Sequence, residues 1–214
     1  MEQINPAIVI EVAPAVSLAS ASANLQIIDP AVSQAKFEEE TKLFLNSAGL
    51  HRKRGIIVLD CSFPNIKLAF CARQIIPAPV VFAVNINYTN YDMEALSVKF
   101  INPFTFELIT LQELRHNFSR KVPIGNGQMR RQNLALGLPD GTPFICLPGI
   151  REYHKHSDHS NDPWLTHRGK GGEGTLGFIV DKLHQYGIAA INGYHLPLTI
   201  PEVLLGIDLN KLPS

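Results

Sequence analysis

A cysteine and a run of histidines in the second half of the chain have the residue types that nucleophilic or metal chemistry needs. Cys146 lies in Asp140-Gly-Thr-Pro-Phe-Ile-Cys146-Leu-Pro148, a short apolar segment between an Asp-Gly turn and a Pro-Gly turn. These flanks favour an extended position that presents the thiol to solvent. Titratable residues that follow it include Glu152, His154, His156, His159, Asp162 and His167.

These residues are compatible with two kinds of chemistry. An accessible thiolate can carry an acyl group, and a protonated histidine beside it lowers its pKa. Alternatively, Cys146, His154, His156 and His159 provide enough thiolate and imidazole groups for a zinc ion. Their spacing matches no standard zinc signature, and bound zinc would occupy the thiol. We therefore expect a nucleophilic cysteine with no metal or cofactor, and keep a zinc site and an inert buried thiol as alternatives.

Composition excludes several broad classes. Lys+Arg and Asp+Glu number 19 each, so no overall charge favours nucleic acid or an anionic membrane. The basic runs 51–54 and 130–131 are interpreted as solvated turns, with a binding role as the alternative. Three cysteines form no disulfide framework, and the residues given show neither a basic n-region before an apolar h-region nor an apolar run of transmembrane length. We expect a reduced, cytoplasmic protein that binds neither nucleic acid nor membrane.

The first element that the sequence predicts is a helix. Asp29 and Pro30 are typical of an N-cap and a first helical position. The pattern predicts a helix to about residue 48, ended by Gly49. Its aromatic residues share one stripe, while residues 38–40, all glutamate, are expected to face water.

Four strands follow. The apolar and alternating segments 55–63, 66–73, 80–88 and 97–101 predict an antiparallel meander. Cys61 and Cys71 fall within the first two strands, so we expect both thiols to be buried and Cys146 to be partly accessible. The result is an α+β fold, with an N-terminal helix packed on a four-stranded antiparallel meander and with C-terminal helices.

The rest of the chain is less regular. Residues 102–140 form an extended insertion rich in Pro, Gly, Asn and Arg, with one predicted helix at 108–118. A polar stretch follows Cys146 as far as Gly174, and an amphipathic helix is predicted from Thr175 to Tyr186. We divide the chain into an N-terminal arm, residues 1–30, and one domain, residues 31–214.

This order of elements resembles the core of a ubiquitin-conjugating enzyme over residues 31–187. Residues 82–100 resemble the third strand of that family, its Tyr-Pro turn and the start of its fourth strand. Asp140-Gly141 followed by Ile145-Cys146-Leu147 resembles its Gly-x-Ile-Cys-Leu active site, and Trp164 stands where the family has its tryptophan.

The sequence departs from the family pattern at three places. Tyr91 is followed by Asp92 instead of proline, and Ala95-Leu96 replaces the double proline. The His-Pro-Asn motif is missing, with Leu138 at the position of its asparagine.

The pattern of Cys146, Glu152, His154 and His159 resembles a prokaryotic Cys-Glu-His-His family described as a predicted metal-binding domain. Members of that family occur in bacterial operons for ubiquitin-like conjugation that are linked to anti-phage defence.

The resemblance implies a transferase that accepts a ubiquitin-like modifier as a thioester on Cys146 and passes it to an amine. His154, His159 and Glu152 are then the catalytic candidates around the thiol. In the absence of the motif asparagine, backbone N–H groups after Cys146, Asn133 or a histidine are the candidate oxyanion donors. The implied partners are the ubiquitin-like protein, an activating-enzyme-like protein and a JAB-type deconjugating protease from the same operon.

A second function class remains open. A non-catalytic adaptor of the same fold, stabilised by zinc in one version, would bind the ubiquitin-like protein or its activating enzyme. An adaptor does not need a thiol in a solvent-facing turn, which favours the transferase.

Overall fold

A four-stranded antiparallel sheet is the centre of the computed structural model, which describes residues 26–191 and 193. Its strands are β1 (Ile56–Ser62), β2 (Asn65–Cys71), β3 (Val80–Asn87) and β4 (Ser97–Ile101), in that order across the sheet. The predicted meander and the mixed α+β class are confirmed. Most of the predicted N-terminal arm lies outside the described residues, and its boundary at residue 30 stays a prediction.

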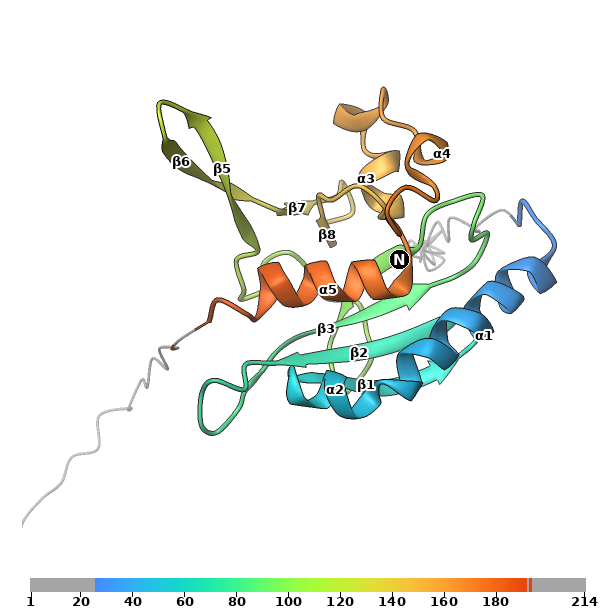
Figure 1. Ribbon diagram of the computed structural model, residues 1–214, viewed down its shortest axis with the longest axis horizontal. Coiled ribbons are helices and arrows are strands. Elements are labelled where there is room, and N and C mark those ends of the chain that lie inside the picture. The colour runs from blue at the N-terminus through green and yellow to red at the C-terminus, as the bar shows by residue number, and fades with distance from the viewer. Residues whose placement is uncertain (1–25, 192, 194–214) are drawn as a thin grey trace, which may run out of the picture.

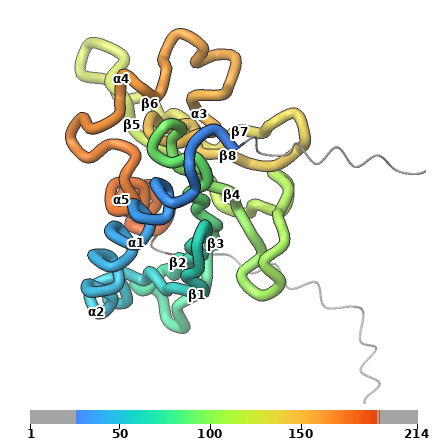
Figure 2. The backbone as a smooth tube through the Cα atoms, turned by 90° about the vertical axis from the view of Figure 1, so that its right-hand side faces the viewer, coloured from blue at the N-terminus to red at the C-terminus, as the bar shows by residue number. Residues whose placement is uncertain are grey.

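Two helices cover one face of this sheet (Figures 1 and 2). Helix α1 (Pro30–Asn46) starts as predicted, because the Asp29 carboxylate accepts a hydrogen bond from the Ala31 N–H at 2.9 Å. Helix α5 (Leu176–Gly187) is capped by Thr175 and buries the predicted apolar stripe against the sheet. The core joins aromatic and aliphatic side chains of both helices to the inner face of the strands, including Phe37, Phe44, Leu68, Phe70, Phe82, Phe100, Ile179 and Leu183.

The predicted helix end at Gly49 is wrong. After a break at Ser47 the chain forms a second helix, α2 (Ala48–Lys53), and this helix includes most of the basic run 51–54. Gly55 ends this helix, with a φ of 84° that residues with a side chain rarely adopt. A Cβ there would lie 2.1 Å from the Cys71 carbonyl oxygen. The helical segment therefore ends at Gly55, where β2 comes close to the backbone, and not at the first glycine, Gly49.

The expectation that Glu40 faces water is also wrong. Its carboxylate accepts hydrogen bonds from the hydroxyls of Tyr88 (2.9 Å) and Tyr91 (3.0 Å) and from the Leu176 N–H (2.8 Å). Because an acidic group at a helix N-terminus is favourable, this contact caps α5 as well. Glu40 thus ties α1, the loop after β3 and the start of α5 together.

The insertion contains strands instead of the helix predicted at 108–118. The Ile109 N–H donates to the Phe100 carbonyl and the Leu111 N–H to that of Gly141. Only a turn at residues 111–113 is left of the predicted helix. The chain then forms a hairpin of β5 (Ser119–Gly125) and β6 (Gln128–Asn133), followed by a short pair, β7 (Ala135–Gly137) and β8 (Pro143–Ile145). Arg130 and Arg131 lie in β6, not in a solvated turn. The hairpin projects away from the sheet (Figure 1).

The polar stretch after Cys146 is more regular than the sequence indicates. It contains three short helical turns, α3 (Arg151–Lys155), η1 (Ser157–His159) and α4 (Trp164–His167). A bridge between Leu96 and Ile150 fixes α3 beside β4. Among the described residues, no helix has the length and apolar character that crossing a membrane requires.

Candidate active site around Cys146

Cys146 directly follows β8, and the strand pair β7–β8 holds it in place. The Asp140 carboxylate accepts hydrogen bonds from the N–H and the hydroxyl of Thr142, which orders the turn before β8. The Cys146 N–H donates to the Leu134 carbonyl at 2.7 Å. Phe144 and Ile145 are buried, whereas Cys146 is only partly buried. The backbone is therefore fixed on both sides of a thiol that solvent can reach.

His159 is the histidine that contacts this thiol. Its Nε2 lies 3.2 Å from the Cys146 Sγ, close enough for a proton to pass between them. The imidazole stacks on the Tyr153 ring at 3.9 Å between centroids, and the Tyr153 hydroxyl donates to the Asp162 carboxylate at 2.8 Å. The stacking keeps the ring against the sulfur.

The charges around Cys146 act in opposite directions. Burial raises the pKa of the thiol, the Arg120 guanidinium lowers it, and the Asp158 carboxylate raises it, with burial the largest effect. The resting group is thus a thiol, and it needs a base to become a nucleophile. His159 is placed to be that base. Sequence reasoning missed Arg120, because it lies in the hairpin and only the fold brings it near the thiol.

His154 is held by backbone groups on both of its nitrogens. The Gly149 N–H donates to Nε2 at 3.0 Å, so Nδ1 carries the proton and donates to the Asp162 carbonyl at 2.7 Å. This neutral ring positions the turn directly after Cys146. Because neither nitrogen has a lone pair to spare, the arrangement does not leave His154 available as a base or as a metal ligand.

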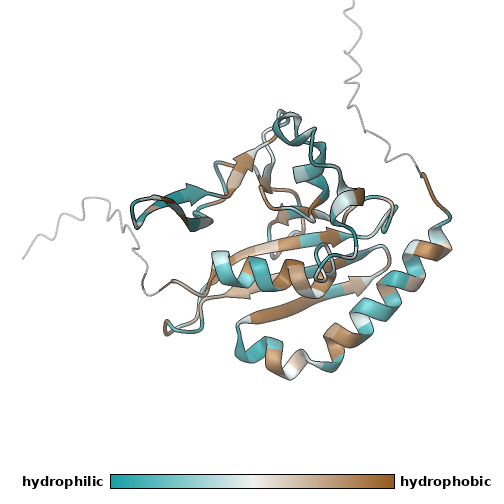
Figure 3. Ribbon diagram, turned by 45° about the horizontal axis from the view of Figure 1, so that its top comes forward, coloured by the Kyte–Doolittle hydropathy of each residue, from teal (hydrophilic) through white to brown (hydrophobic). Residues whose placement is uncertain are grey.

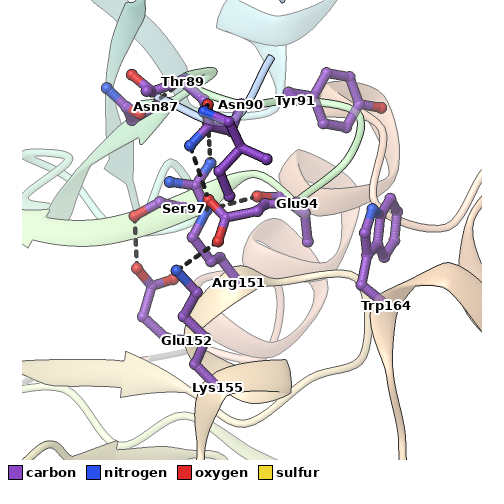
Figure 4. Close-up of polar contacts among 12 residues, drawn as sticks. Asn87, Thr89, Asn90, Tyr91, Glu94, Ser97, Arg151, Glu152, Lys155 and Trp164 are labelled. Carbon is purple, nitrogen blue, oxygen red and sulfur yellow. Dashed lines mark hydrogen bonds and ion pairs between the residues drawn. The ribbon is translucent and has the colours of Figure 1, made fainter. Parts of the chain in front are cut away.

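Glu152 belongs to the packing between α3 and β4. Its carboxylate, 7% exposed, accepts from the Ser97 hydroxyl at 2.5 Å and the Val98 N–H at 3.0 Å. Figure 4 shows this contact beside the Arg151–Glu94–Lys155 group. The structure therefore separates Glu152 from His159, which the sequence pattern had grouped together.

The remaining histidines have other contacts. The His156 Nδ1 accepts from the Asp158 N–H at 3.3 Å, and its ring stacks on Phe144. Within residues 26–191 and 193, no three or more His, Cys, Asp or Glu side chains are placed to hold one metal ion. The alternative ligand set of Cys146, His154, His156 and His159 thus does not converge.

Three of the candidate oxyanion donors are already engaged. The Leu147 N–H donates to the Ile145 carbonyl at 2.9 Å, and the Gly149 N–H donates to His154. The Asn133 amide donates to the Ala135 carbonyl at 3.1 Å. His159, one of these candidates, and Arg120, which the sequence did not suggest, remain as possible donors near the sulfur.

Trp164 packs beneath this region. It is 6% exposed, and its Nε1–H donates to the Asp92 carbonyl at 3.0 Å. Gly174 lies against the ring, where a Cβ would approach within 2.3 Å. His167 donates to the carboxylates of Asp162 and Glu173, which closes the loop that contains Gly174.

The three thiols only partly follow the predicted order of burial. Cys71 is buried, and Cys146 is partly accessible as expected. Cys61 is only partly buried, because its strand is at the edge of the sheet. Its thiol lies beside Thr41 of α1. Accessibility alone therefore does not distinguish Cys146 from Cys61, whereas the imidazole contact does.

His154 and His167 are neighbours whose pKa values shift in opposite directions, so their joint contribution to stability is greatest near pH 6.5. Burial lowers the pKa of His154, so the folded chain keeps this ring neutral at a pH where the unfolded chain is already protonated. Its contribution to the free energy of unfolding is therefore complete above pH 6.5 and is lost as the pH falls. Hydrogen bonds to Asp162 and then Glu173 raise the pKa of His167, so its contribution is complete below 6.5 and is lost as the pH rises through the folded value.

The fluorescence of Trp164, the only tryptophan, measures the first of these steps. Its ring lies 5.7 Å from that of His154, so protonation of the imidazole should quench the emission. We expect a transition below pH 6.5 that the His154→Gln variant lacks. A transition at or above 6.5, or one that persists in this variant, would contradict the assignment.

Sequence comparison identifies relatives of the chain. The profile of the Y4jH-like family (Y4jH family) matches residues 28–191. The uncharacterized protein y4jH of Sinorhizobium fredii (strain NBRC 101917 / NGR234) is 38% identical over 177 residues, which are 76% of this chain and 85% of that protein. The profile match includes the sheet, Cys146 and α5.

Proposed function

The chain belongs to the Y4jH-like family, and we propose that it transfers a ubiquitin-like modifier through a thioester on Cys146. The observation that carries this proposal is the 3.2 Å contact between the Cys146 Sγ and the His159 Nε2 on an accessible loop after β8. A further part of the proposal is that the fold is of the ubiquitin-conjugating type. The α1 helix, the four-strand meander and the helix after the cysteine support it.

In the first step, the Cys146 sulfur attacks the carbonyl carbon of a modifier held as a thioester on an activating enzyme. A new carbon–sulfur bond forms, the old one breaks, and the Cys146 proton passes through His159 to the leaving thiolate. In the second step, an acceptor amine attacks the new thioester, loses its proton to His159, and expels the Cys146 thiolate, which is then reprotonated. The chemistry is undemanding because a thioester is already activated, so placement is the main contribution of the protein.

The groups around the sulfur have distinct roles in this mechanism. Arg120 stabilises the negative charge that develops on the carbonyl oxygen, since its guanidinium is the cation that acts on the Cys146 thiol. His154 positions the Pro148-Gly149 turn through the Gly149 N–H. Glu152 fixes α3 to β4 and does not take part in the chemistry. The proposed partners are an activating-enzyme-like protein, the ubiquitin-like protein and a JAB-type deconjugating protease, in bacterial anti-phage defence.

One observation favours a second function, a non-catalytic adaptor. The backbone N–H groups of Leu147 and Gly149 are engaged within the chain, so neither is ready to bind an oxyanion. An adaptor of this kind would bind the ubiquitin-like protein or its activating enzyme without forming a thioester.

Reconstitution tests the two functions against each other. The chain, its cognate activating enzyme, ATP and the ubiquitin-like protein should yield an adduct that excess thiol cleaves on a non-reducing gel. Omission of ATP should prevent the adduct. Stable binding of the modifier or the activating enzyme without any adduct would support the adaptor and end the transferase proposal.

A further inference from the structure

The β5–β6 hairpin concentrates positive charge that the described part of the chain does not neutralise. Residues 119–133 contain four cations and neither aspartate nor glutamate. The ion pairs among the described residues include none of these cations. The two arginine contacts seen are to neutral groups, Arg120 Nε to Gln132 and Arg131 Nε to Ser119. Figure 3 shows the hairpin as mainly hydrophilic.

The register of the hairpin places two of these charges directly opposite each other. Lys121 pairs with Arg131, so both side chains lie on the same face of the ribbon. Like charges at opposed positions destabilise a strand pair, and an isolated two-stranded hairpin has little stability to spare. The repulsion between Lys121 and Arg131 therefore destabilises the hairpin in the free chain. An anionic partner bound between the two side chains would relieve this repulsion and be attracted by both charges.

The end of the hairpin favours a protein over a nucleic acid as that partner. Ile124 and Met129 are both 56% exposed there, beside the basic residues. Exposed methionine and arginine are enriched in protein interfaces. Single-stranded nucleic acids are usually bound with aromatic side chains that stack on bases, and residues 119–133 contain none.

The hairpin is also connected to the candidate thiol. Its second strand leads into Leu134, whose carbonyl accepts the Cys146 N–H. Arg120, on its first strand, lies near enough to act electrostatically on both Cys146 and Tyr153. A chain segment bound along the hairpin would therefore lie close to the loop that carries the sulfur.

We propose that the β5–β6 hairpin binds an acidic segment with interspersed apolar side chains, on the modifier that Cys146 accepts and passes on. Carboxylates of that segment pair with Lys121 and Arg131, and its apolar side chains contact Ile124 and Met129. The identity of the partner as a transfer substrate rests on the function proposed above, whereas binding of the acidic segment does not.

A labelled peptide of alternating glutamate and leucine residues is the probe, measured by fluorescence anisotropy with the full chain. The Lys121→Gln/Arg131→Gln variant should bind it about tenfold more weakly, since two exposed charge contacts are lost. Lys36→Gln/Lys42→Gln removes the same charge from the exposed face of α1 and is the matched control. Its affinity should stay within about twofold of the unmodified chain. The midpoint temperature of thermal unfolding should be unchanged or slightly higher in the hairpin variant, because the repulsion between Lys121 and Arg131 is removed.

The outcomes separate this proposal from the transferase mechanism. Cys146→Ala should bind the peptide normally, so peptide binding without any thioester would leave the hairpin proposal standing alone. Equal losses in the hairpin and α1 variants would indicate non-specific charge attraction and overturn the proposal. Tighter binding of a single-stranded DNA of similar length, weakened by the same hairpin variant, would also overturn it in favour of a nucleic-acid site.

Discussion

Replacing Cys146 by alanine should abolish the thiol-cleavable adduct completely. No other group at the site can form a thioester, and the matched Cys61→Ala variant removes a second partly exposed thiol without touching His159. Cys146→Ser should give at most an ester that resists thiols. Because Cys146 is only partly buried, we expect its replacement by alanine to change the free energy of unfolding by about 1 kcal/mol or less. Survival of the adduct in Cys146→Ala, with its loss in Cys61→Ala, would show that the nucleophile is misassigned.

His159→Ala extends this experiment from the nucleophile to its base. Thiol exchange needs chiefly the thiolate, whereas attack by an amine also needs proton removal and stabilisation of the oxyanion. We therefore expect discharge of the adduct to amines to slow by about 100-fold or more, and its formation by about tenfold or less. Raising the pH should rescue formation, because hydroxide then supplies the thiolate. His184→Gln, which removes a partly buried imidazole on α5, should leave both rates unchanged. Equal slowing of the two steps would contradict a specific role of His159 in aminolysis.

The central sheet and α5 could be predicted because burial left a clear pattern in their sequences. Strands β1 to β4 are apolar or alternate, and Ile179, Val180 and Leu183 repeat at helical spacing. The β5–β6 hairpin has no such pattern, since neither of its faces is in the core. A local signal was nevertheless present. Asn126 and Gly127 both have positive φ, as expected for an Asn-Gly hairpin turn.

The candidate site was predicted less fully than the sheet. The turn before Cys146 follows from local residues, and so does its accessibility. Which histidine reaches the sulfur depends on the path through α3 and η1, and that path is set by contacts distant in sequence. Glu152 shows this clearly. Its position near Cys146 and the histidines in the sequence suggested a catalytic role, but its carboxylate accepts hydrogen bonds from Ser97 and Val98 on β4.

Arg151 is the residue whose loss should destabilise the fold most among the polar groups near the site. It is 5% exposed, and its guanidinium donates to the carbonyls of Ala95 (2.9 Å) and Thr89 and lies 3.6 Å from the Glu94 carboxylate. Figure 4 shows these contacts joining α3 to the loop between β3 and β4. Arg151→Met leaves those buried acceptors unpaired, so we expect a loss of about 3 kcal/mol in the free energy of unfolding.

Lys155→Met is the matched control, because Lys155 binds the same Glu94 carboxylate at 2.6 Å from a side chain that is 59% exposed. An exposed ion pair contributes about 0–1 kcal/mol, so this variant should unfold at nearly the original urea concentration. The midpoint of urea unfolding at constant slope measures both changes. Similar losses in the two variants would mean that the ion pair, not the buried backbone acceptors, is what stabilises this junction.

The same pair of variants tests how the fold supports the site. Arg151 begins α3, and α3 carries Tyr153, on which His159 stacks, and His154, which holds the turn after Cys146. If α3 acts as a rigid support, Arg151→Met should slow adduct formation by more than its unfolded fraction explains, while Lys155→Met should not. An Arg151→Met chain that remains folded and forms the adduct at the original rate would show that the Cys146–His159 geometry does not depend on this anchor.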